Sequence, residues 1–403
     1  MSSKFTRRGA VQIAGAAALT PSFSWAASAR RQWPIEEGPD TPKICLNSGD
    51  GAMPPPMGEQ AAGAQQGQPG GRGMGGGNQE ASWRRIRQLG VTHIIGIGLG
   101  QHPWEEEKIR AVIQRVKDAG LTFYGTLISF SNNITYGRQG RDADLELLLK
   151  SIQAAGKAGL PLIEYNYYAN RVMEGYFEEL GRAGIGHTGF DYEREVEEGG
   201  KKMRVRELPP RPNVGAMTAA EMWNNLTYAL KAIIPVAEKA GVRMACHPND
   251  PPAPLSRGSE QIMGSVAGWK RLISIVDSPA NGITFDCGVT REMGEDPVEV
   301  CRYFASRDRI NHCHYRNVIV MKPYERYKEV SIDEGQVDMF NVMLELVKAK
   351  YRRTIFPEHP RALDYDRDRP GFRPQYPGGG GYAGYAFTVA YTRAMIQAAL
   401  SSV

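Results

Sequence analysis

Short apolar runs alternate with amphipathic stretches along most of this 403-residue chain, and this alternation limits the folds open to it. The apolar runs have the length of buried strands, and the amphipathic stretches have helical periodicity. The candidate strands are Lys43–Asn47, Thr92–Gly98, Thr122–Ser129, Pro161–Tyr167, Arg243–His247, Gly282–Cys287, Ile310–Tyr315 and Thr354–Pro357. The candidate helices are Ala81–Leu89, Trp104–Ala119, Asp142–Ala158, Ala219–Ala240, Gly264–Val276, Pro297–Ser306, Val337–Ala349 and Tyr385–Leu400. Eight such pairs predict an α/β fold, the (β/α)8 TIM barrel.

The barrel is expected to form a single domain over residues 30–403, because a TIM barrel needs only about 250 residues and tolerates long loops. Two segments interrupt the alternation. Residues 51–79 are rich in Gly, Pro, Gln and Ala, so they are interpreted as a low-complexity insertion. Residues 171–212 are polar and are expected to form a long βα loop on the catalytic face.

The N-terminus has the pattern of a targeting segment. Paired arginines, Arg7 and Arg8, precede an apolar stretch, Gly9–Leu19, and small residues at Ala27–Ala29 suit a cleavage site. We therefore expect residues 1–29 to be a twin-arginine-type signal peptide and the protein to be exported to the periplasm. The alternatives are an ordinary secretory peptide and an unprocessed membrane anchor. No later stretch is apolar enough to span a bilayer, so no stable membrane insertion is expected after processing.

Charge and cysteine content limit the classes of binding partner and the disulfide bonds that we expect. The net charge of +5 is spread along the chain, which gives no footprint for nucleic acid and only a weak attraction for anionic small molecules. A homo-oligomer is compatible with the sequence. The five cysteines contain no CxxC pair, so a disulfide framework is not expected. Cys45, Cys301 and Cys313 are interpreted as packing residues.

Metal-capable side chains follow four successive predicted strands. In a TIM barrel the active site lies at the carboxyl ends of the strands. These ends carry Cys246–Pro252 (CHPNDPP), Asp286–Gly288 (DCG), His312–Asn317 (HCHYRN) and Pro357–Pro360 (PEHP). Strand alternation places His312 and His314 on one face, with Cys313 pointing away. Imidazole, thiolate and carboxylate donors around one axis predict a site for Mn, Fe, Co or Zn.

These motifs resemble a known family. His247-Pro-x-Asp-Pro-Pro, Val276–Gly282 (VDSPANG), His314–Val318 (HYRNV) and Gly335–Met339 (GQVDM) follow one another as in the mannonate dehydratases. The resemblance runs from about Ser82 to Leu400 and is specific through the last four strands. It implies a xylose-isomerase-like TIM barrel in which a divalent metal, Mn or Fe, assists the removal of water from a small-molecule sugar acid, D-mannonate or a related aldonate. The expected product is 2-keto-3-deoxy-D-gluconate.

Residue by residue, the resemblance implies His247, Cys287, His314 and Glu358 as metal ligands. Two positions depart from the family pattern. Glu358-His359-Pro360 stands where the family more often has Asp followed by His-Gly, and Asn249 stands where the family carries Asp. The longer carboxylate of Glu358 shifts the ligand oxygens by about one methylene. Asn249 removes a charge close to the expected site.

The dehydration that the resemblance implies requires an acid and a base. His359, next to a ligand, and Tyr382 and Tyr385, in a glycine-rich turn that resembles a family segment with a catalytic tyrosine, are the candidates. For the tyrosines the alternative is packing at a helix start.

Four further residues are expected to bind the substrate. They are Arg316, which would clamp a carboxylate, Asn317 and Asp250, which would orient hydroxyls or a ligand imidazole, and Asn166, which would line the pocket wall. Pairing of Arg316 with an acidic loop and simple packing of Asn166 are the alternatives.

Two other functions remain open from the residues. A sugar isomerase or epimerase of the same barrel superfamily would use the metal to polarise a carbonyl. An exported, non-catalytic sugar-acid-binding protein would keep the barrel, and the departures at Asn249 and Glu358 motivate that hypothesis.

Overall fold

The computed structural model describes residues 38–52 and 79–403, all within one compact unit, Glu36–Val403. The predicted signal peptide at residues 1–29 and most of the insertion at 51–79 lie outside the described residues. Among the described helices, none is both long and apolar enough to cross a membrane.

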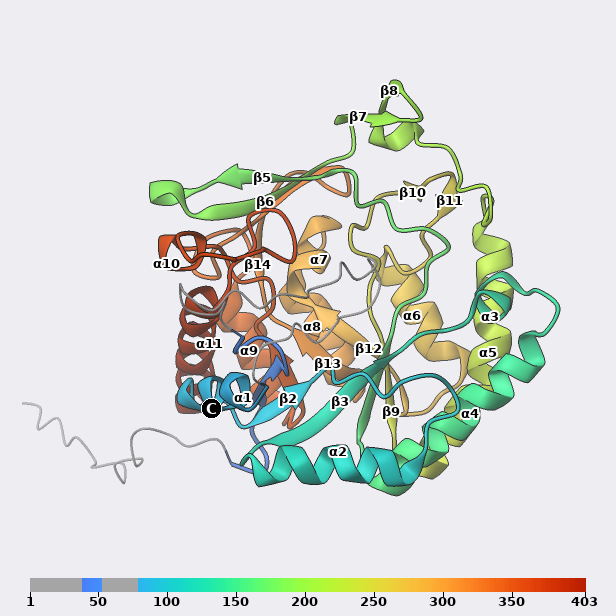
Figure 1. The fold of residues 1–403 in the computed structure, drawn as a ribbon, viewed down its shortest axis with the longest axis horizontal. Helices are drawn as coiled ribbons and strands as arrows, with labels where there is room; N and C mark the ends of the chain where they lie inside the picture. The colour runs from blue at the N-terminus through green and yellow to red at the C-terminus, as the bar shows by residue number, and fades with distance from the viewer. Residues whose placement is uncertain (1–37, 53–78) are drawn as a thin grey trace, which may run out of the picture. The chain divides into compact units, whose positions relative to one another are not determined.

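A closed barrel of eight parallel strands forms the centre of the part of the chain that the structure describes (Figure 1). Each barrel strand pairs with the next one along the chain, and β16 closes the barrel against β1. The strands are β1 Lys43–Asn47, β2 His93–Ile95, β3 Thr122–Ile128, β4 Leu162–Tyr165, β9 Arg243–Cys246, β12 Asn281–Asp286, β13 Ile310–His314 and β16 Thr354–Phe356. The predicted TIM barrel is confirmed, with every strand end within three residues of its expected position.

Helices follow the strands and cover the outside of the barrel. The longer ones are α1 Gln79–Gln88, α2 Glu106–Asp118, α4 Arg141–Ala158, α5 Ala219–Ala240, α6 Val266–Ile275, α8 Pro297–Ala305, α9 Met339–Lys348 and α11 Tyr382–Ser401. Local sequence sets their ends. Thr218 and Glu221 form a capping box at the start of α5, and Gly241 ends that helix with a φ of 70°. Three short helices, α3 Asn132–Tyr136, α7 Cys287–Glu292 and α10 Asp364–Arg367, lie in the connections.

Large apolar side chains fill the space between the strands and the helices. Trp269 of α6 packs edge-to-face with Phe304 of α8, with ring centroids 6.1 Å apart, and both are buried. The interior of the barrel is more polar. The Thr284 hydroxyl donates to Glu164 Oε1 at 2.8 Å, and Nδ1 of the fully buried His312 lies 2.9 Å from the Thr354 hydroxyl. Polar groups in such a place need partners, so they mark the interior as the location of the site.

The segment predicted as a long loop at 171–212 contains regular structure. It forms strands β5 Tyr176–Leu180, β6 Gly186–Asp191, β7 Glu195–Glu198 and β8 Lys201–Arg204, with the short helices η1 Arg182–Gly184 and η2 Val205–Glu207. The first two strands join β14 Asn317–Lys322 and β15 Arg326–Val330 in a four-stranded antiparallel sheet, in the order β14-β15-β6-β5. We call this the cap sheet. Another short hairpin, β10 Leu255–Ser256 and β11 Ser259–Glu260, follows β9.

The cap sheet begins directly after the carboxyl ends of barrel strands. β14 starts three residues after β13 ends, and the segment with β5 and β6 follows β4. Tyr327 of β15 and Phe190 of β6 stack at 5.1 Å in a small separate core of the sheet. The segment follows the carboxyl end of β4, and it contains a sheet where an irregular loop was expected.

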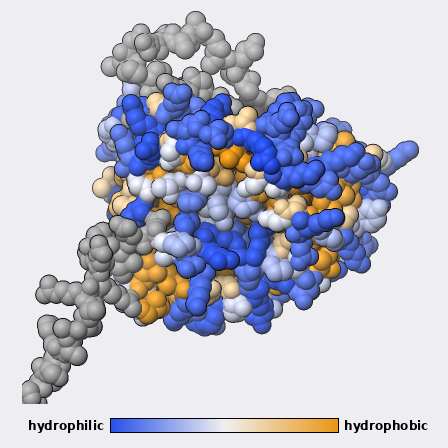
Figure 2. Space-filling model, turned by 90° about the horizontal axis from the view of Figure 1, so that it is seen from below, coloured by the Kyte–Doolittle hydropathy of each residue, from blue (hydrophilic) through white to orange (hydrophobic). Residues whose placement is uncertain are grey.

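The described surface mixes polar and apolar residues. On the face drawn in Figure 2, hydrophilic side chains cover most of the surface and hydrophobic ones lie in separate patches. Exposed large apolar residues such as Leu180, Met321 and Tyr365 come from different elements. The expectation of a homo-oligomer stays a prediction.

Candidate metal centre and active site

Four side chains from four successive barrel strands converge on one point. His247 follows β9, Asp286 ends β12, His314 ends β13, and Glu358 follows β16. Each offers a ligand atom, and these atoms all lie within 4.8 Å of one another. His314 Nδ1 lies 3.2 Å from His247 Nε2 and 3.0 Å from Glu358 Oε1. We call these four residues the metal cluster.

Backbone register brings two of these side chains together. Asp286 and His314 are partners across the β12–β13 pair. Strand alternation turns Asp286 to the same side as Thr284, whose hydroxyl contacts Glu164 inside the barrel. Asp286 Oδ2 lies 3.9 Å from His314 Nδ1, while Oδ1 accepts a hydrogen bond from the Val289 backbone at 2.8 Å. The same carboxylate therefore serves the cluster and caps α7.

The thiol of Cys287, which the resemblance implies as a ligand, does not belong to the metal cluster in this structure. Cys287 is the first residue of α7, and its thiol is absent from the ligand-type groups of the described residues. Its Sγ donates to the backbone oxygen of Arg316 at 3.2 Å, and burial raises the pKa of the thiol. The cluster therefore offers two imidazoles and two carboxylates, with Asp286 in the place that the sequence assigned to the thiolate.

The protonation state of His247 fits a cation site. His247 donates from Nδ1 to the Pro248 carbonyl at 2.7 Å, which leaves the Nε2 lone pair directed at the cluster. Burial and then the charge of His314 lower the pKa of His247 to about 4, so this imidazole is neutral near pH 7.

His314 holds the opposite charge state in this structure. Burial opposes its charge, yet Glu358 and then Glu164 and Asp286 raise the pKa of His314 to about 9. The Nδ1 proton of His314 thus lies between His247 and Glu358, two groups that also suit a metal. A divalent cation bound at the cluster would displace this proton. The donor set fits a divalent cation of the borderline or hard class, such as Mn, Fe, Co, Zn or Mg.

Arg316 lies beside the metal cluster and is surrounded by acids. Its guanidinium is buried, with carboxylates of five described residues within 4.0 Å. The shortest contacts are 2.7 Å to Glu292 Oε1 and 3.1 Å to Asp286 Oδ2, and Glu358 Oε1 lies 3.3 Å away. The other two carboxylates belong to Asp250 and Glu329. Its proposed contact with a substrate carboxylate stays a prediction, since protein carboxylates already contact each of its nitrogens.

A second group of ligand-type side chains adjoins the first. Asp250, Glu329 and His359 bring their polar atoms within 4.8 Å of one another. Asp250 Oδ1 accepts from the Tyr176 hydroxyl of the cap sheet at 2.5 Å. His359 Nδ1 lies 2.9 Å from Glu329 Oε2, and its Nε2 lies 3.6 Å from Glu358 Oε2. The candidate acid–base residue His359 therefore lies next to the metal cluster, and its catalytic role stays a prediction.

Two other candidates have structural contacts elsewhere. The Asn317 side chain accepts from the Val318 and Val337 backbones at 3.0 Å and donates to Ile332, so it holds a loop and does not face the cluster. The Tyr382 hydroxyl donates to the Arg85 carbonyl of α1 at 3.2 Å. The polar atoms of both side chains are thus directed to backbone partners, and neither residue is brought to the metal cluster.

Tyr385 and Asn166 are closer to the expected region. Tyr385 is buried, stacks against Phe356 of β16 at 6.5 Å and shares a hydrogen bond with Asp50. Asn166 is half-buried directly after β4, at the carboxyl end of the barrel. Their roles in catalysis and substrate binding stay predictions.

The structure explains the amide at Asn249 without reference to the substrate. Its amide donates to the Tyr167 carbonyl at 3.1 Å and accepts from the Met263 backbone at 2.9 Å. A carboxylate could accept but not donate, so the amide suits this buried place better than Asp. The charge that Asn249 removes, relative to the Asp of the family, is therefore lost at a residue with a structural role.

The residues that the sequence interpretation missed are Asp286, Glu329, Glu164 and Arg361. Asp286 carried a usable signal, because its spacing of two from Thr284 places both on one face of β12. Glu164 lies below the cluster, with Oε1 3.6 Å from His314 Nε2. Glu329 comes from β15 of the cap sheet, a strand that the helical and strand periodicities did not reveal.

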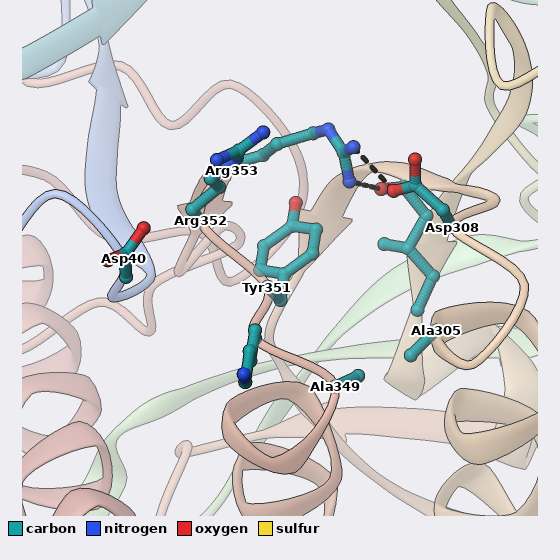
Figure 3. A pocket seen from close by; sticks show the side chains of 9 residues that line it. Asp40, Ala305, Asp308, Ala349, Tyr351, Arg352 and Arg353 are labelled. Atoms are coloured by element: carbon teal, nitrogen blue, oxygen red, sulfur yellow. Dashed lines mark hydrogen bonds and ion pairs between the residues drawn. The ribbon is translucent and has the colours of Figure 1, made fainter.

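A separate pocket of about 250 Å³ lies at the opposite end of the barrel (Figure 3). It is lined at the first residues of β13 and just before β16, including Asp308, Ile310 and Arg353. Figure 3 shows the Arg353 guanidinium directed at Asp308, with 2.5 Å between Nη2 and Oδ1. β13 alone separates the pocket from His314 by about 13 Å, at ~3.3 Å per residue, so it is not part of the active site.

The fold and the site together define a class of protein, the TIM-barrel enzymes with a metal-site-like cluster at the carboxyl ends of the strands. A profile of the family described as D-mannonate dehydratase (UxuA) matches residues 72–399. The chain belongs to this family and is a mannonate dehydratase-like hydro-lyase.

Individual relatives agree. The mannonate dehydratase of Bacillus subtilis is 30% identical over 75% of this chain and 90% of its own. That of Enterococcus faecalis is 28% identical over 72% of this chain and 88% of its own. The crystal structure of mannonate dehydratase from Streptococcus suis serotype 2 superposes with a TM-score of 0.67 at 26% identity, over 79% of this chain and 90% of that one. A xylose isomerase-like TIM barrel protein from Mycobacterium smegmatis in complex with magnesium shares the fold, with a TM-score of 0.54 at 12% identity, over 89% of this chain and 98% of that one.

Proposed function

We propose that this protein dehydrates D-mannonate, or a closely related aldonate, to the 2-keto-3-deoxy acid, with Mn or Fe as the divalent metal. Membership of the mannonate dehydratase family supports the reaction type. The observation that carries the proposal for this chain is the metal cluster, in which four donors from four strands lie within 4.8 Å of one another. His359 Nε2 faces the same place, so metal ligands and a proton-transfer group are adjacent.

His247, Asp286, His314 and Glu358 would hold the metal. When bound, it supplies a Lewis acid that stabilises negative charge developing on the substrate carboxylate. Two imidazoles and two carboxylates suit Mn or Fe, whose preferences lie between those of Mg and of the thiophilic metals. Arg316 keeps the acids of the site partly neutralised through its contacts with Asp286 and Glu358.

Residues of the chain would then move the proton. His359 Nε2 is directed at the cluster, so it can accept the proton on the carbon next to the carboxylate. The neighbouring hydroxyl leaves as water when it receives a proton, and the same imidazolium can return it, which restores neutral His359. The enol that remains becomes the keto acid by tautomerisation. The barrel and the cap sheet surround these groups with buried side chains that limit access of bulk water.

The test is turnover of aldonic and uronic acids by protein reloaded with Mn or Fe after treatment with a chelator. We expect a 2-keto-3-deoxy product from D-mannonate, no product from the metal-free protein, and loss of metal and turnover in His247→Ala. An epimer of a free sugar as the product would replace the proposal with the epimerase alternative. Ligand binding without any turnover, unchanged in His247→Ala, would favour the non-catalytic binding protein.

We propose also that the protein reaches the periplasm by the twin-arginine route. The support is the Arg7–Arg8 pair with the apolar stretch after it. Cell fractionation of the full chain should find the processed protein in the periplasm, and replacement of both arginines with lysine should retain it in the cytoplasm. Periplasmic protein from the double variant at the wild-type level would contradict the proposed route.

A further inference from the structure

A carboxylate of the cap sheet contacts the candidate acid–base histidine. Glu329 lies on β15 and is almost completely buried. Its Oε2 accepts from His359 Nδ1 at 2.9 Å and from Arg361 Nη2 at 2.9 Å. Arg361 Nη2 lies 2.9 Å from Oε2 and Arg316 Nη1 lies 3.7 Å from Oε1, and two fixed positive charges at these distances favour the ionised form. The residue is therefore an ionised carboxylate whose best-placed acceptor oxygen is directed at the imidazole.

Arg361 closes a ring of contacts around the same histidine. Its Nε and Nη2 donate to the backbone oxygen of His359 at 2.9 and 2.7 Å, while Nη2 also reaches Glu329. His359 itself has a φ of 49°, which is uncommon for a residue with a side chain. The imidazole of His359 also lies against the ring of Tyr376, with ring centroids 4.5 Å apart. Backbone, carboxylate and aromatic contacts thus fix the imidazole in one orientation.

In this orientation the two ring nitrogens of His359 have different roles. Nδ1 is occupied by Glu329, and a hydrogen bond at this position requires the proton on Nδ1. Nε2 is 3.6 Å from Glu358 Oε2 at the edge of the metal cluster. A neutral His359 would therefore present the Nε2 lone pair to a substrate bound at the cluster.

A second metal at Asp250, Glu329 and His359 is the competing interpretation, since these three form a ligand-type group. Guanidinium groups already contact both carboxylates. Arg316 lies 3.5 Å from Asp250 and 3.7 Å from Glu329, while Arg361 lies 2.9 Å from Glu329. A divalent cation there would lie close to two fixed positive charges at short range, which is strongly unfavourable in a buried site. The arginines thus supply the positive charge that a second metal would bring.

We infer that Glu329 is a positioning residue, which holds His359 with Nδ1 protonated and Nε2 directed at the substrate. The inference rests on the proposed function and adds a residue that lies outside the barrel strands. The arrangement has the logic of a base oriented by a carboxylate behind it. One proton moves from the substrate carbon to Nε2 and then to the departing hydroxyl, while Glu329 stays ionised and stabilises the transient imidazolium.

The experiment compares Glu329→Gln, Glu329→Asp and the control Glu325→Gln. Glu325 precedes β15 and pairs with the exposed Lys322 at 2.6 Å, so the control removes the same charge from the same hairpin. In Glu329→Gln we expect kcat to fall by about 10²–10⁴, the usual contribution of acid–base catalysis. KM and bound metal should stay within about twofold. Glu329→Asp should recover part of kcat, and Glu325→Gln should resemble the wild type.

A second measurement does not need turnover. In protein labelled with ¹⁵N-histidine, with the signal assigned through His359→Gln, the proton on His359 Nδ1 should be protected from exchange and should lose this protection in Glu329→Gln. An unchanged Nδ1 proton, or a kcat within about threefold of wild type in Glu329→Gln, overturns the inference. Two metal ions per chain also overturn it. A wild type that turns over no aldonate while the Nδ1 proton behaves as expected counts against the proposed function alone.

Discussion

At the scale of single residues, Asp286 combines two roles that are usually separate. One oxygen caps α7 through the Val289 backbone, and the other faces His314 and Arg316. Burial, and to a smaller extent the negative charges of Glu358 and Asp250, raise the pKa of Asp286 to about 7, although Arg316 and His314 lower it. A cation at the cluster would neutralise part of this negative charge, so Asp286 contributes more to metal binding than to the stability of the metal-free protein.

Asp286→Asn separates the two roles. Asparagine can still cap the helix through its side-chain oxygen, but it offers a weaker, uncharged donor to the metal. We expect the metal dissociation constant to rise at least about tenfold, while the melting temperature of the metal-free protein changes little. Asp338→Asn is the control, because Asp338 caps α9 in the same way through Asn341 at 3.0 Å. Equal metal affinity in Asp286→Asn and wild type would remove Asp286 from the ligand set.

Cys287 gives the complementary prediction. Its thiol is buried against the backbone of Arg316, and serine can donate the same hydrogen bond. Cys287→Ser is therefore expected to retain the metal stoichiometry and turnover of the wild type, measured by elemental analysis after chelation and reloading. His247→Ala, treated in parallel, should lose the metal. Loss of metal from Cys287→Ser would restore the thiolate to the ligand set.

At the scale of elements, the barrel could be predicted and the cap sheet could not. Barrel strands are buried on both faces, so β13 and its neighbours appear as apolar runs between helical periods. The strands of the cap sheet are partly exposed and rich in charge, as in the alternating burial of β5 and β7. They look like a polar loop in the sequence, and their pairing across distant segments is visible only in the fold.

The same difference explains which site residues were found. His247, His314 and Glu358 end apolar runs, so the TIM-barrel rule identified them directly. Glu329 lies on β15, and no rule that starts from barrel strands leads to it. Cys287 was preferred over Asp286 because of its chemistry, although the two-residue repeat of β12 turns Asp286 to the same face as Thr284.

Capping gives a prediction at this scale. Thr218 accepts from the Glu221 backbone at 3.3 Å, and Glu221 contacts the Thr218 backbone at 2.9 Å. Thr218→Ala should lower the free energy of unfolding in urea by about 0.5–2 kcal/mol, since a donor at the start of α5 loses its partner. Glu221→Gln keeps the capping box and should cost much less. A loss in Glu221→Gln as large as that in Thr218→Ala would contradict the assignment of this stability to the hydrogen bonds of the cap.

At the scale of the whole described unit, the two ends of the barrel have different tasks. The carboxyl end carries the metal cluster, and the amino end is tied by Asp308. Arg243 at the start of β9 reaches Asp308 at 2.7 Å, and Arg353 just before β16 reaches it at 2.5 Å. Partial burial opposes the charge, but both arginines lower the pKa of Asp308. Residues at this end of a TIM barrel contribute to stability and not to the reaction.

Asp308→Asn tests this division. Asparagine tolerates the φ of 57° at this position, so the change removes the charge and preserves the backbone. We expect the free energy of unfolding to fall by less than about 2 kcal/mol, because each half-exposed pair contributes up to about 1 kcal/mol. Metal content and kcat should not change. Asp277→Asn, which breaks a single ion pair of a fully exposed carboxylate with Arg309, should have almost no effect.

The two parts of the active site come from different segments of the chain. The metal cluster comes from barrel strands, whereas Glu329 and Tyr176 arrive on two hairpins placed after β13 and β4. Hairpins that follow a strand end can lengthen, shorten or be exchanged without disturbing the hydrogen bonds of the barrel. Within such an architecture, evolution can keep the ion and alter the group that orients the base. New reactions can then arise from changes in the hairpins alone, with the barrel as a constant platform.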